Sequence, residues 1–213
     1  MKQKLIRTFY SLLAVVTCTV AGLPGLAVAE PESQTVLITG ANRGIGLELA
    51  RQYIEAGWRV IGTARKPGAA VDLAELGADV LQLDVTSQDS VQRLADDLEG
   101  RPVDLLINNA GIQPLFWKLA DVDFDAFDRA MDVNATGPVR VTKALMPNLQ
   151  AGNGRLIVNI TSNLGSIEAN TDGGFYGYRE SKVALNMFTK SLAAEFGPEG
   201  FICIVMNPGW VQT

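Results

Sequence analysis

Short apolar runs alternate with amphipathic stretches along the chain from Gln34 onward, and this alternation most constrains the fold. The strand-like runs lie at residues 35–38, 59–63, 79–83, 104–107, 155–160 and 201–206. Between these runs we predict helices, from helical spacing of apolar residues or from helix-start signals, at 45–56, 71–76, 87–98, 123–146 and 178–196. Strands separated in this way form a parallel sheet with helices on both faces. We therefore predict one three-layer α/β domain, a doubly wound Rossmann fold with the strand order 3-2-1-4-5-6.

Pro138 interrupts the longest helical stretch, 123–146. Phe124, Phe127 and Met131 recur there at near-helical spacing. A proline inside a helix lacks a backbone N–H and clashes with the preceding turn. We therefore expect a kink or a break at Pro138.

A glycine segment, TGANRGIG at residues 39–46, lies between the first strand and the first helix. Gly40 permits a tight turn, while Gly44 and Gly46 let the backbone approach a pyrophosphate and let the helix pack on the strand. The free N–H groups of the helix N-terminus attract phosphate. An isolated glycine motif is often only a turn, but its place between a strand and a helix favours a dinucleotide site.

Tyr178 and Lys182 form a Tyr-x-x-x-Lys motif on the last predicted helix, where a separation of four residues places them on one face. A tyrosine with an ordinary pKa of ~10 can protonate a carbonyl oxygen, and we expect the Lys182 ammonium to lower that pKa. The motif alone is weak, because any amphipathic helix can carry it. Tyr176 lacks such a partner, since Glu180 stands four residues later.

These motifs, in this order, resemble the short-chain dehydrogenases/reductases of the classical type over residues 36–213. Other segments that carry the resemblance are Asp84-Val85, Asn108-Asn109-Ala110-Gly111, Val133-Asn134-Ala135, Ile160-Thr161-Ser162 and Pro208-Gly209. The sequences YRESK, followed by ALN, and PGWVQT look closest to carbonyl reductases of the C-factor and sniffer type.

The resemblance implies a role for each catalytic residue. Tyr178 is expected to be the general acid/base, and Lys182 to bind the nicotinamide ribose and tune Tyr178. Ser162 is expected to hydrogen-bond the substrate carbonyl, and Asn134 to hold a water in a proton relay. Thr161 offers a second hydroxyl, but Ser162 matches the family position. The expected substrate is a small-molecule aldehyde, ketone or quinone, which is reduced to an alcohol.

The expected cofactor is NADP(H), with NAD(H) as the alternative. Arg65 follows the second strand, where an acidic residue would bind the ribose of NAD, and Arg43 lies in the glycine segment. Arginines suit a 2′-phosphate because they bind it through two hydrogen bonds and stay charged. Asp84 matches an adenine-binding position, although a helix-start aspartate is an equally good interpretation. The cofactor residues implied are Gly40, Asn42, Arg43, Gly44, Ile45, Gly46, Arg65, Asp84, Val85, Asn109, Ala110, Gly111, Tyr178, Lys182, Pro208, Gly209, Val211 and Thr213.

Composition excludes several other kinds of site. The 213 residues include no histidine, which removes histidine metal sites and Ser-His or Cys-His mechanisms, so we expect no metal. The net charge of −5, without any Lys/Arg cluster, argues against nucleic acid as a partner. Of the two cysteines, only Cys203 lies outside the N-terminal segment, so we expect no intrachain disulfide.

Residues 1–29 have the features of a signal peptide. Lys2, Lys4 and Arg7 precede an apolar core at 9–20, and Ala27-Val28-Ala29 resembles a cleavage site. Cleavage before Glu30 would leave a domain of residues 30–213, exported to the periplasm or cell envelope without a stable membrane span. The alternatives are an uncleaved N-terminal anchor and a misassigned start codon. The second would leave the protein in the cytoplasm, where nicotinamide cofactors are recycled.

The resemblance also bears on the C-terminus. Family members continue past the Pro-Gly segment into a substrate loop, a helix and a seventh strand, so we expect a truncated domain that lacks the usual last strand. Residues 201–206 would then form an unpaired apolar edge. Three alternatives remain open: a non-catalytic dinucleotide-binding or regulatory protein, an inactive fragment, and an interaction protein of the cell envelope. A homo-oligomer through the long helices, 123–146 and 178–196, is also expected.

Overall fold

The computed structural model describes residues 33–209. The predicted signal peptide, and the predicted cofactor residues Val211 and Thr213, lie outside this range and stay predictions. None of the helices in residues 33–209 combines the length and the apolar character needed to cross a membrane.

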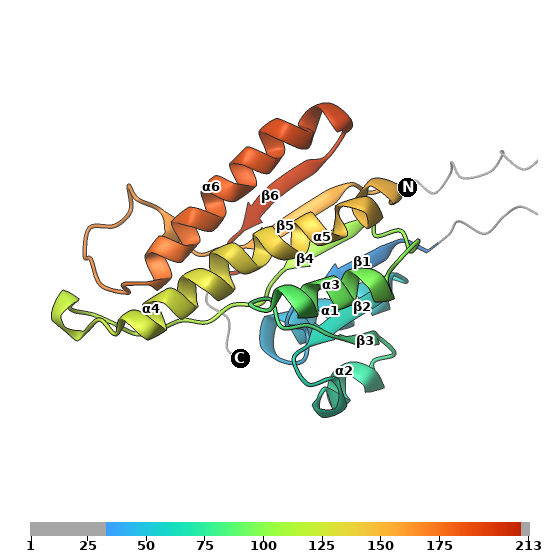
Figure 1. Ribbon diagram of the computed structural model, residues 1–213, viewed down its shortest axis with the longest axis horizontal. Helices are drawn as coiled ribbons and strands as arrows, with labels where there is room; N and C mark the ends of the chain where they lie inside the picture. Colours follow the sequence, from blue (N-terminus) through green and yellow to red (C-terminus); the bar gives the residue numbers. More distant parts are fainter. Residues whose placement is uncertain (1–32, 210–213) are drawn as a thin grey trace, which may run out of the picture. The chain divides into compact units, whose positions relative to one another are not determined.

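Six strands form one parallel sheet in the order β3-β2-β1-β4-β5-β6 (Figure 1). They are β1 (Thr35–Ile38), β2 (Arg59–Ala64), β3 (Asp79–Gln82), β4 (Leu105–Asn108), β5 (Leu156–Ile160) and β6 (Ile202–Met206). Each predicted strand agrees with the observed one to within one residue at either end. The strand order reverses between β1 and β4, where connections depart in opposite directions and leave a crevice at the carboxyl ends. The predicted doubly wound fold is confirmed.

Helices cover the two faces of the sheet. They are α1 (Gly44–Glu55), α2 (Val71–Glu75), α3 (Gln88–Asp97), α4 (Phe124–Met131), α5 (Gly137–Ala151) and α6 (Tyr178–Phe196). Successive strand side chains point to opposite faces. Thus Leu37 packs in the cluster that contains α3, α5 and α6, whereas Val36 and Ile38 pack in the cluster with α1 and α2. Each face of the sheet is therefore covered by its own apolar cluster of helix and strand side chains.

Of the kink or break expected at Pro138, the break is wrong, because no loop separates the helices there; the α-helical hydrogen-bond pattern is nevertheless interrupted just before this residue. α4 runs into a π-helical turn, Asp132–Thr136, and then directly into α5. Gly137 donates its backbone N–H to the carbonyl of Asp132, five residues earlier. Pro138 thus lies in the first turn of α5, at the junction of two hydrogen-bond registers, where its missing N–H does least harm.

β6 is the edge of the sheet in the described part of the chain and pairs only with β5. Ile202, Ile204 and Met206 are each at least 39% exposed, although β6 forms a regular ladder with β5. The expected apolar edge at residues 201–206 is confirmed, except that Phe201 is buried in the core.

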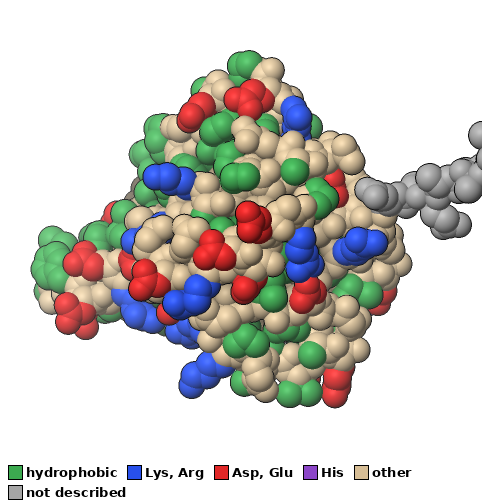
Figure 2. Space-filling model, turned by 45° about the vertical axis from the view of Figure 1, so that its right-hand side comes forward, with side chains coloured by type: hydrophobic (Ala, Val, Ile, Leu, Met, Phe, Trp, Pro, Cys, Tyr) green, Lys and Arg blue, Asp and Glu red, His purple; other side chains and the backbone are tan. Residues whose placement is uncertain are grey.

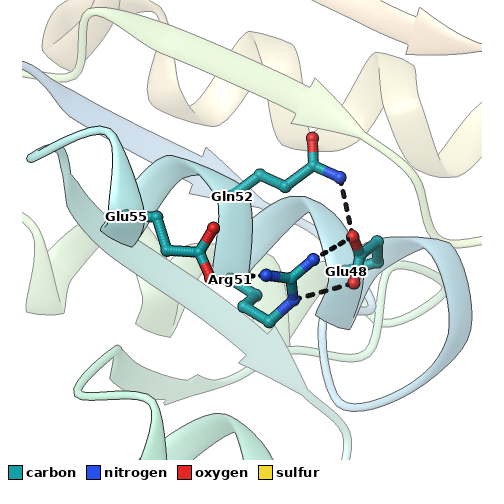
Figure 3. Close-up of polar contacts among 4 residues, drawn as sticks. All are labelled: Glu48, Arg51, Gln52 and Glu55. Carbon is teal, nitrogen blue, oxygen red and sulfur yellow. Dashed lines mark hydrogen bonds and ion pairs between the residues drawn. The ribbon is translucent and has the colours of Figure 1, made fainter.

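Arg51 on the outer surface of α1 lies between two glutamates (Figure 3). Its Nε donates to Glu48 at 3.0 Å, its Nη1 pairs with Glu55, and Gln52 also donates to Glu48 at 2.7 Å. The hydrogen bond from Arg51, and after it the one from Gln52, holds the pKa of Glu48 below its usual value. Exposed pairs of this kind stabilise a helix only slightly, so the position of α1 depends on its buried face.

Candidate active site

The glycine segment forms a tight turn that leads from β1 into α1. Gly40 and Gly44 have φ values of +64° and +55°, in the left-handed region that favours glycine. A Cβ atom on Gly46 would lie 2.5 Å from the carbonyl oxygen of Gly40 and 2.6 Å from Nδ2 of Asn109. The turn therefore has the tight geometry and close helix packing that the sequence predicts, and the N-terminus of α1 is open to a phosphate.

Asn109 and Thr39 join this turn to the end of β4. Asn109 Nδ2 donates to the carbonyl oxygens of Thr39 at 2.9 Å and Gly40 at 3.1 Å. In return, Thr39 Oγ1 accepts from the backbone N–H groups of Asn109 and Ala110, both at 3.0 Å. Thr39 was not among the predicted site residues, although its place before Gly40 in the motif could have identified it. These four hydrogen bonds fix the shape of the turn.

A cleft of about 470 Å³ opens at the carboxyl ends of β1 to β4. Most of the predicted cofactor residues line it: Gly40, Asn42, Arg43, Gly44, Ile45, Arg65, Asp84, Val85, Asn109, Ala110 and Gly111. The sequence analysis did not name five others, Ala64, Leu83, Ile112, Arg129 and Val133. Gly46 lies beneath the turn and not in the cleft wall. The volume is that of a typical small-molecule site.

Three arginines and one aspartate give the cleft its charge. Arg43, Arg65 and Arg129 line it together with Asp84. Asp84 Oδ1 accepts from Thr86 Oγ1 at 2.7 Å and from its N–H at 3.0 Å. The Thr86 hydroxyl is the main cause that holds the pKa of Asp84 below its usual value, and Arg65 and Arg129 add to it. The region is thus positive overall, with a carboxylate that stays ionised.

Asp84 does not cap α3, although its N–H donates to Ser90 Oγ of that helix at 2.8 Å. Ser87 caps α3, because its Oγ accepts from the N–H of Ser90 at 3.2 Å. Asp84 stands before this cap and turns its carboxylate to Thr86. Asp84 thus lies both in the cleft wall and at the entry to α3, and its role with the adenine stays a prediction.

Lys182 is buried at the start of α6, with 4% of its surface exposed. Its Nζ donates to the carbonyl oxygen of Ile160 at 2.8 Å and lies 5.6 Å from the centre of the Tyr178 ring. Burial lowers the pKa of Lys182 to about 8. The predicted pairing of Tyr178 and Lys182 on one helix face is confirmed.

The expected lowering of the Tyr178 pKa is wrong for this structure. Burial raises the pKa of Tyr178, and the neighbouring Ser162 hydroxyl acts in the opposite direction. The ammonium of Lys182 is bonded to Ile160 and lies near the ring, so it does not offset the cost of desolvating a phenolate. Tyr178 is therefore a neutral phenol at physiological pH.

Ser162 lies beside Tyr178, whereas Thr161 faces elsewhere. Thr161 Oγ1 donates to Asn186 Oδ1 on α6 at 2.7 Å and is used in the packing of the helix. Ser162 Oγ accepts from the N–H of Leu164 at 3.2 Å, which leaves its hydroxyl hydrogen for another acceptor. This geometry agrees with the choice of Ser162 over Thr161.

Asn134 is fully buried in the π-helical turn and ties three segments together. Its Oδ1 accepts from the N–H of Ile112 and its Nδ2 donates to the carbonyl of Ile112, both at 2.8 Å. Nδ2 also donates to Ser181 Oγ at 3.0 Å, and Ser181 donates to the carbonyl of Tyr178 at 2.7 Å. Ser181 was missed by the sequence analysis. π turns are often found at functional sites, and in this one Asn134 reaches Ser181 on α6.

Gly111 lies between the cleft and the predicted catalytic residues. A Cβ atom placed on Gly111 would lie 3.3 Å from Oδ1 of Asn134 and 3.8 Å from Nζ of Lys182. Gly111 also lines the cleft, so Lys182 and Asn134 lie close to the cleft wall, although they are not among the residues that line it. Pro208 and Gly209 follow β6, where Asn207 Nδ2 donates to Asn163 Oδ1 at 2.6 Å, next to Ser162.

Comparison with known proteins adds to this geometry. The family model for short chain dehydrogenase matches residues 34–213. The chain is 51% identical to C-signal of Myxococcus xanthus over 112 residues, 53% of this chain and 68% of that protein. It is 37% identical to retinol dehydrogenase 5 of Mus musculus over 84% of this chain, and it spans 57% of the length of that relative.

Two solved structures share the fold closely. The carbonyl reductase Sniffer of D. melanogaster superposes with a TM-score of 0.79 at 34% identity, covering 84% of this chain and 81% of that one. A carbonyl reductase from chicken fatty liver, solved with NADPH bound, gives a TM-score of 0.76 at 29% identity over 84% and 80%. The glycine turn, the Tyr-x-x-x-Lys helix and these matches agree, and the chain belongs to the short-chain dehydrogenase family, whose members are oxidoreductases.

Proposed function

We propose that this protein is an NADP(H)-dependent reductase that converts an aldehyde, ketone or quinone to an alcohol. The observation that carries the proposal is that Ser162 and Lys182 both lie beside Tyr178, and that Lys182 comes close to Gly111 in the cleft wall. The cleft wall suits the cofactor, since the glycine turn leaves room for a pyrophosphate and arginines stand near it. The bound nicotinamide would supply the hydride.

Tyr178 acts as the general acid in this proposal. Because burial keeps its phenol protonated, it can donate a proton to the carbonyl oxygen as negative charge develops there. The Ser162 hydroxyl donates a second hydrogen bond to the same oxygen, and this bond strengthens as the oxygen becomes an alkoxide. The two groups therefore stabilise the transition state more than the bound carbonyl.

Lys182 supports this proton transfer. One of its three ammonium hydrogens is used by the Ile160 carbonyl, and two remain for ribose hydroxyls. A positive charge 5.6 Å from the Tyr178 ring also favours the phenolate left after the proton has gone. Asn134 holds Tyr178 in place through Ser181, and the predicted role in holding a water remains part of the proposal.

The preference for NADP(H) rests on the arginines. Arg43 and Arg65 line the cleft and suit a 2′-phosphate, because guanidinium groups bind phosphate through two hydrogen bonds. Asp84 and Val85 would hold the adenine. Pro208 and Gly209, with Val211 and Thr213, would flank the nicotinamide. The NADPH carried by the chicken carbonyl reductase supports the same choice.

The test is oxidation of NADPH by purified protein with aldehydes, ketones and quinones, with Tyr178→Phe assayed in parallel. We expect turnover with at least one carbonyl class and its loss in Tyr178→Phe. NADPH binding by a folded protein without any turnover would contradict the reductase and favour the non-catalytic alternative.

The export signal at residues 1–29 is a second, separate proposal, which rests on the charged and apolar pattern of that segment. It predicts that the mature chain begins at Glu30. Mass spectrometry of the protein recovered from an envelope fraction would show a shorter chain; the full-length mass in the cytoplasmic fraction would contradict it.

A further inference from the structure

Residues 163–177 connect Ser162, after β5, to Tyr178, the first residue of α6, and we call them the Ser–Tyr connection. Its last part has an unusual backbone. Gly173, Gly174 and Gly177 have φ values between +68° and +81°, and Phe175 among them has +53°. A bulky residue in this region is strained, so other contacts must hold it there.

Arg179 supplies these contacts. Its Nε donates to the carbonyl of Gly174 at 3.1 Å, Nη2 to that of Gly173 at 3.2 Å, and Nη1 reaches that of Leu164 at 3.5 Å. The guanidinium also lies 5.8 Å from the centre of the Phe175 ring. One side chain thus contacts both ends of the Ser–Tyr connection.

Phe175 extends this hold to the segment between β4 and α4. Its ring centre lies 4.3 Å from that of Trp117, and Tyr176 donates its N–H to the carbonyl of Phe116 at 3.2 Å. A Cβ on Gly174 would lie 2.9 Å from Trp117. Other apolar side chains of the same region, Leu115, Leu119 and Phe124, are exposed. On the projecting left-hand end of the molecule in Figure 2, hydrophobic and acidic side chains lie together.

The position of Arg179 has no better explanation in the helix itself. A cation in the first turn of a helix is unfavourable, because the N-terminus is the positive end of the dipole. Glu180 already caps α6, since its carboxylate accepts from the N–H of Gly177 at 2.6 Å. None of the ion pairs found in residues 33–209 involves Arg179. Its recorded side-chain hydrogen bonds all go to carbonyls of the Ser–Tyr connection.

We propose that Arg179 is a positioning residue, which holds the Ser–Tyr connection closed so that Ser162 and Tyr178 meet at one carbonyl oxygen. The inference rests on the proposed reductase for its catalytic consequence, but the hold itself does not. When Arg179 is removed, the strained backbone at 173–177 relaxes and the two hydroxyls lose their fixed separation. A small displacement of reacting groups lowers the rate strongly.

The experiment compares Arg179→Met and Arg179→Lys with Arg93→Met, which changes an exposed arginine on α3. Hydrogen exchange of the amides in 163–177 is measured first, with those of β1 as reference. In Arg179→Met we expect exchange about tenfold faster in the connection alone. We expect kcat, expressed per NADPH-binding site, to fall about ten- to hundredfold, and the Kd for NADPH to stay within about twofold because no cleft residue has changed.

Arg179→Lys should recover part of both losses, because an ammonium can bond some of the carbonyls but not all three in one plane. Arg93→Met should match the wild type.

Unchanged amide exchange at 163–177 in Arg179→Met would show that Arg179 does not hold the Ser–Tyr connection. Faster exchange with unchanged kcat would overturn the positioning role. If the wild type reduces no carbonyl, the proposed function fails while the exchange data still decide the hold. If Arg179→Met loses structure throughout, the amide exchange and the kcat of Arg179→Lys take its place in the test.

Discussion

Lys182 Nζ is hydrogen-bonded to the carbonyl oxygen of Ile160, 2.8 Å away, so the last residue of β5 holds the amine that stands beside Tyr178. The bond crosses from the sheet to the N-terminal part of α6. It fixes the lysine near the tyrosine ring, at 5.6 Å from its centre, without using the phenol hydroxyl. That hydroxyl is therefore left for a substrate and for Ser162.

Tyr178→Phe should lower kcat by about a thousandfold, since general acids of this kind contribute 10²–10⁴-fold. The ring and its packing are kept, so the Kd for NADPH should change less than about twofold. Steady-state rates and fluorescence titration with NADPH measure the two quantities. Equal kcat in both proteins would exclude Tyr178 as the acid.

The stability of the protein should rise with pH between about pH 8 and 9 because of Lys182. Its pKa is lowered from 10.5 to about 8 by burial, so in this range the folded chain has released a proton that the unfolded chain still holds. The free energy of unfolding therefore increases as pH rises. Urea denaturation at several pH values measures it, and Lys182→Met is the matched variant in which this contribution is absent. A constant difference between the two proteins across this range would contradict the buried amine.

Arg65→Asp should weaken NADPH binding about ten- to hundredfold and NADH binding much less, because a carboxylate would face the 2′-phosphate in place of a guanidinium. Titration with each nucleotide gives the ratio of the two Kd values. Arg93→Asp makes the same charge change on α3, away from the cleft, and should leave the ratio unchanged. An unaltered ratio in Arg65→Asp would remove Arg65 from the phosphate site.

Gly46→Ala should destabilise the fold by about 1–3 kcal/mol. Alanine is the better helix former, but its Cβ would stand 2.5 Å from the carbonyl oxygen of Gly40, on a backbone that cannot move away. Urea unfolding measures the change. Gly68→Ala is the control, since no atom lies within 4 Å of its added Cβ, and it should stay within about 0.5 kcal/mol of the wild type. A stabilised Gly46→Ala would show that the turn adapts.

The strands and the glycine turn could be predicted from the sequence because their signals are local. A short apolar run between turn residues indicates a buried strand without reference to the rest of the chain. Gly40, Gly44 and Gly46 are each required by the backbone of the turn in which they stand. The strand order follows from the alternation of strands and helices, which leaves few ways to connect a parallel sheet.

The rest of the site depends on contacts between segments far apart in the chain. In the π turn, Asn134 forms hydrogen bonds with Ile112 and Ser181, which are far away in the sequence. The residues around Pro138 give no sign of these partners, so the turn could not be predicted from them. Arg129 lines the cleft because the fold brings α4 close to Asp84, which follows β3. The raised pKa of Tyr178 likewise reflects burial that only the folded chain creates.

The π turn also lets one continuous helix orient Asn134 and pack α5 against the sheet separately. Across Asp132–Gly137 the backbone hydrogen bond spans five residues, so the rod holds a wider loop there than an α-helix would. Val141 and Leu145, farther along, keep their phase toward the sheet, while Asn134 is rotated toward α6. Shortening this turn by one residue would realign Asn134 and leave the buried stripe of α5 facing the sheet. The orientation of Asn134 and the packing of α5 in the core can thus change independently of one another.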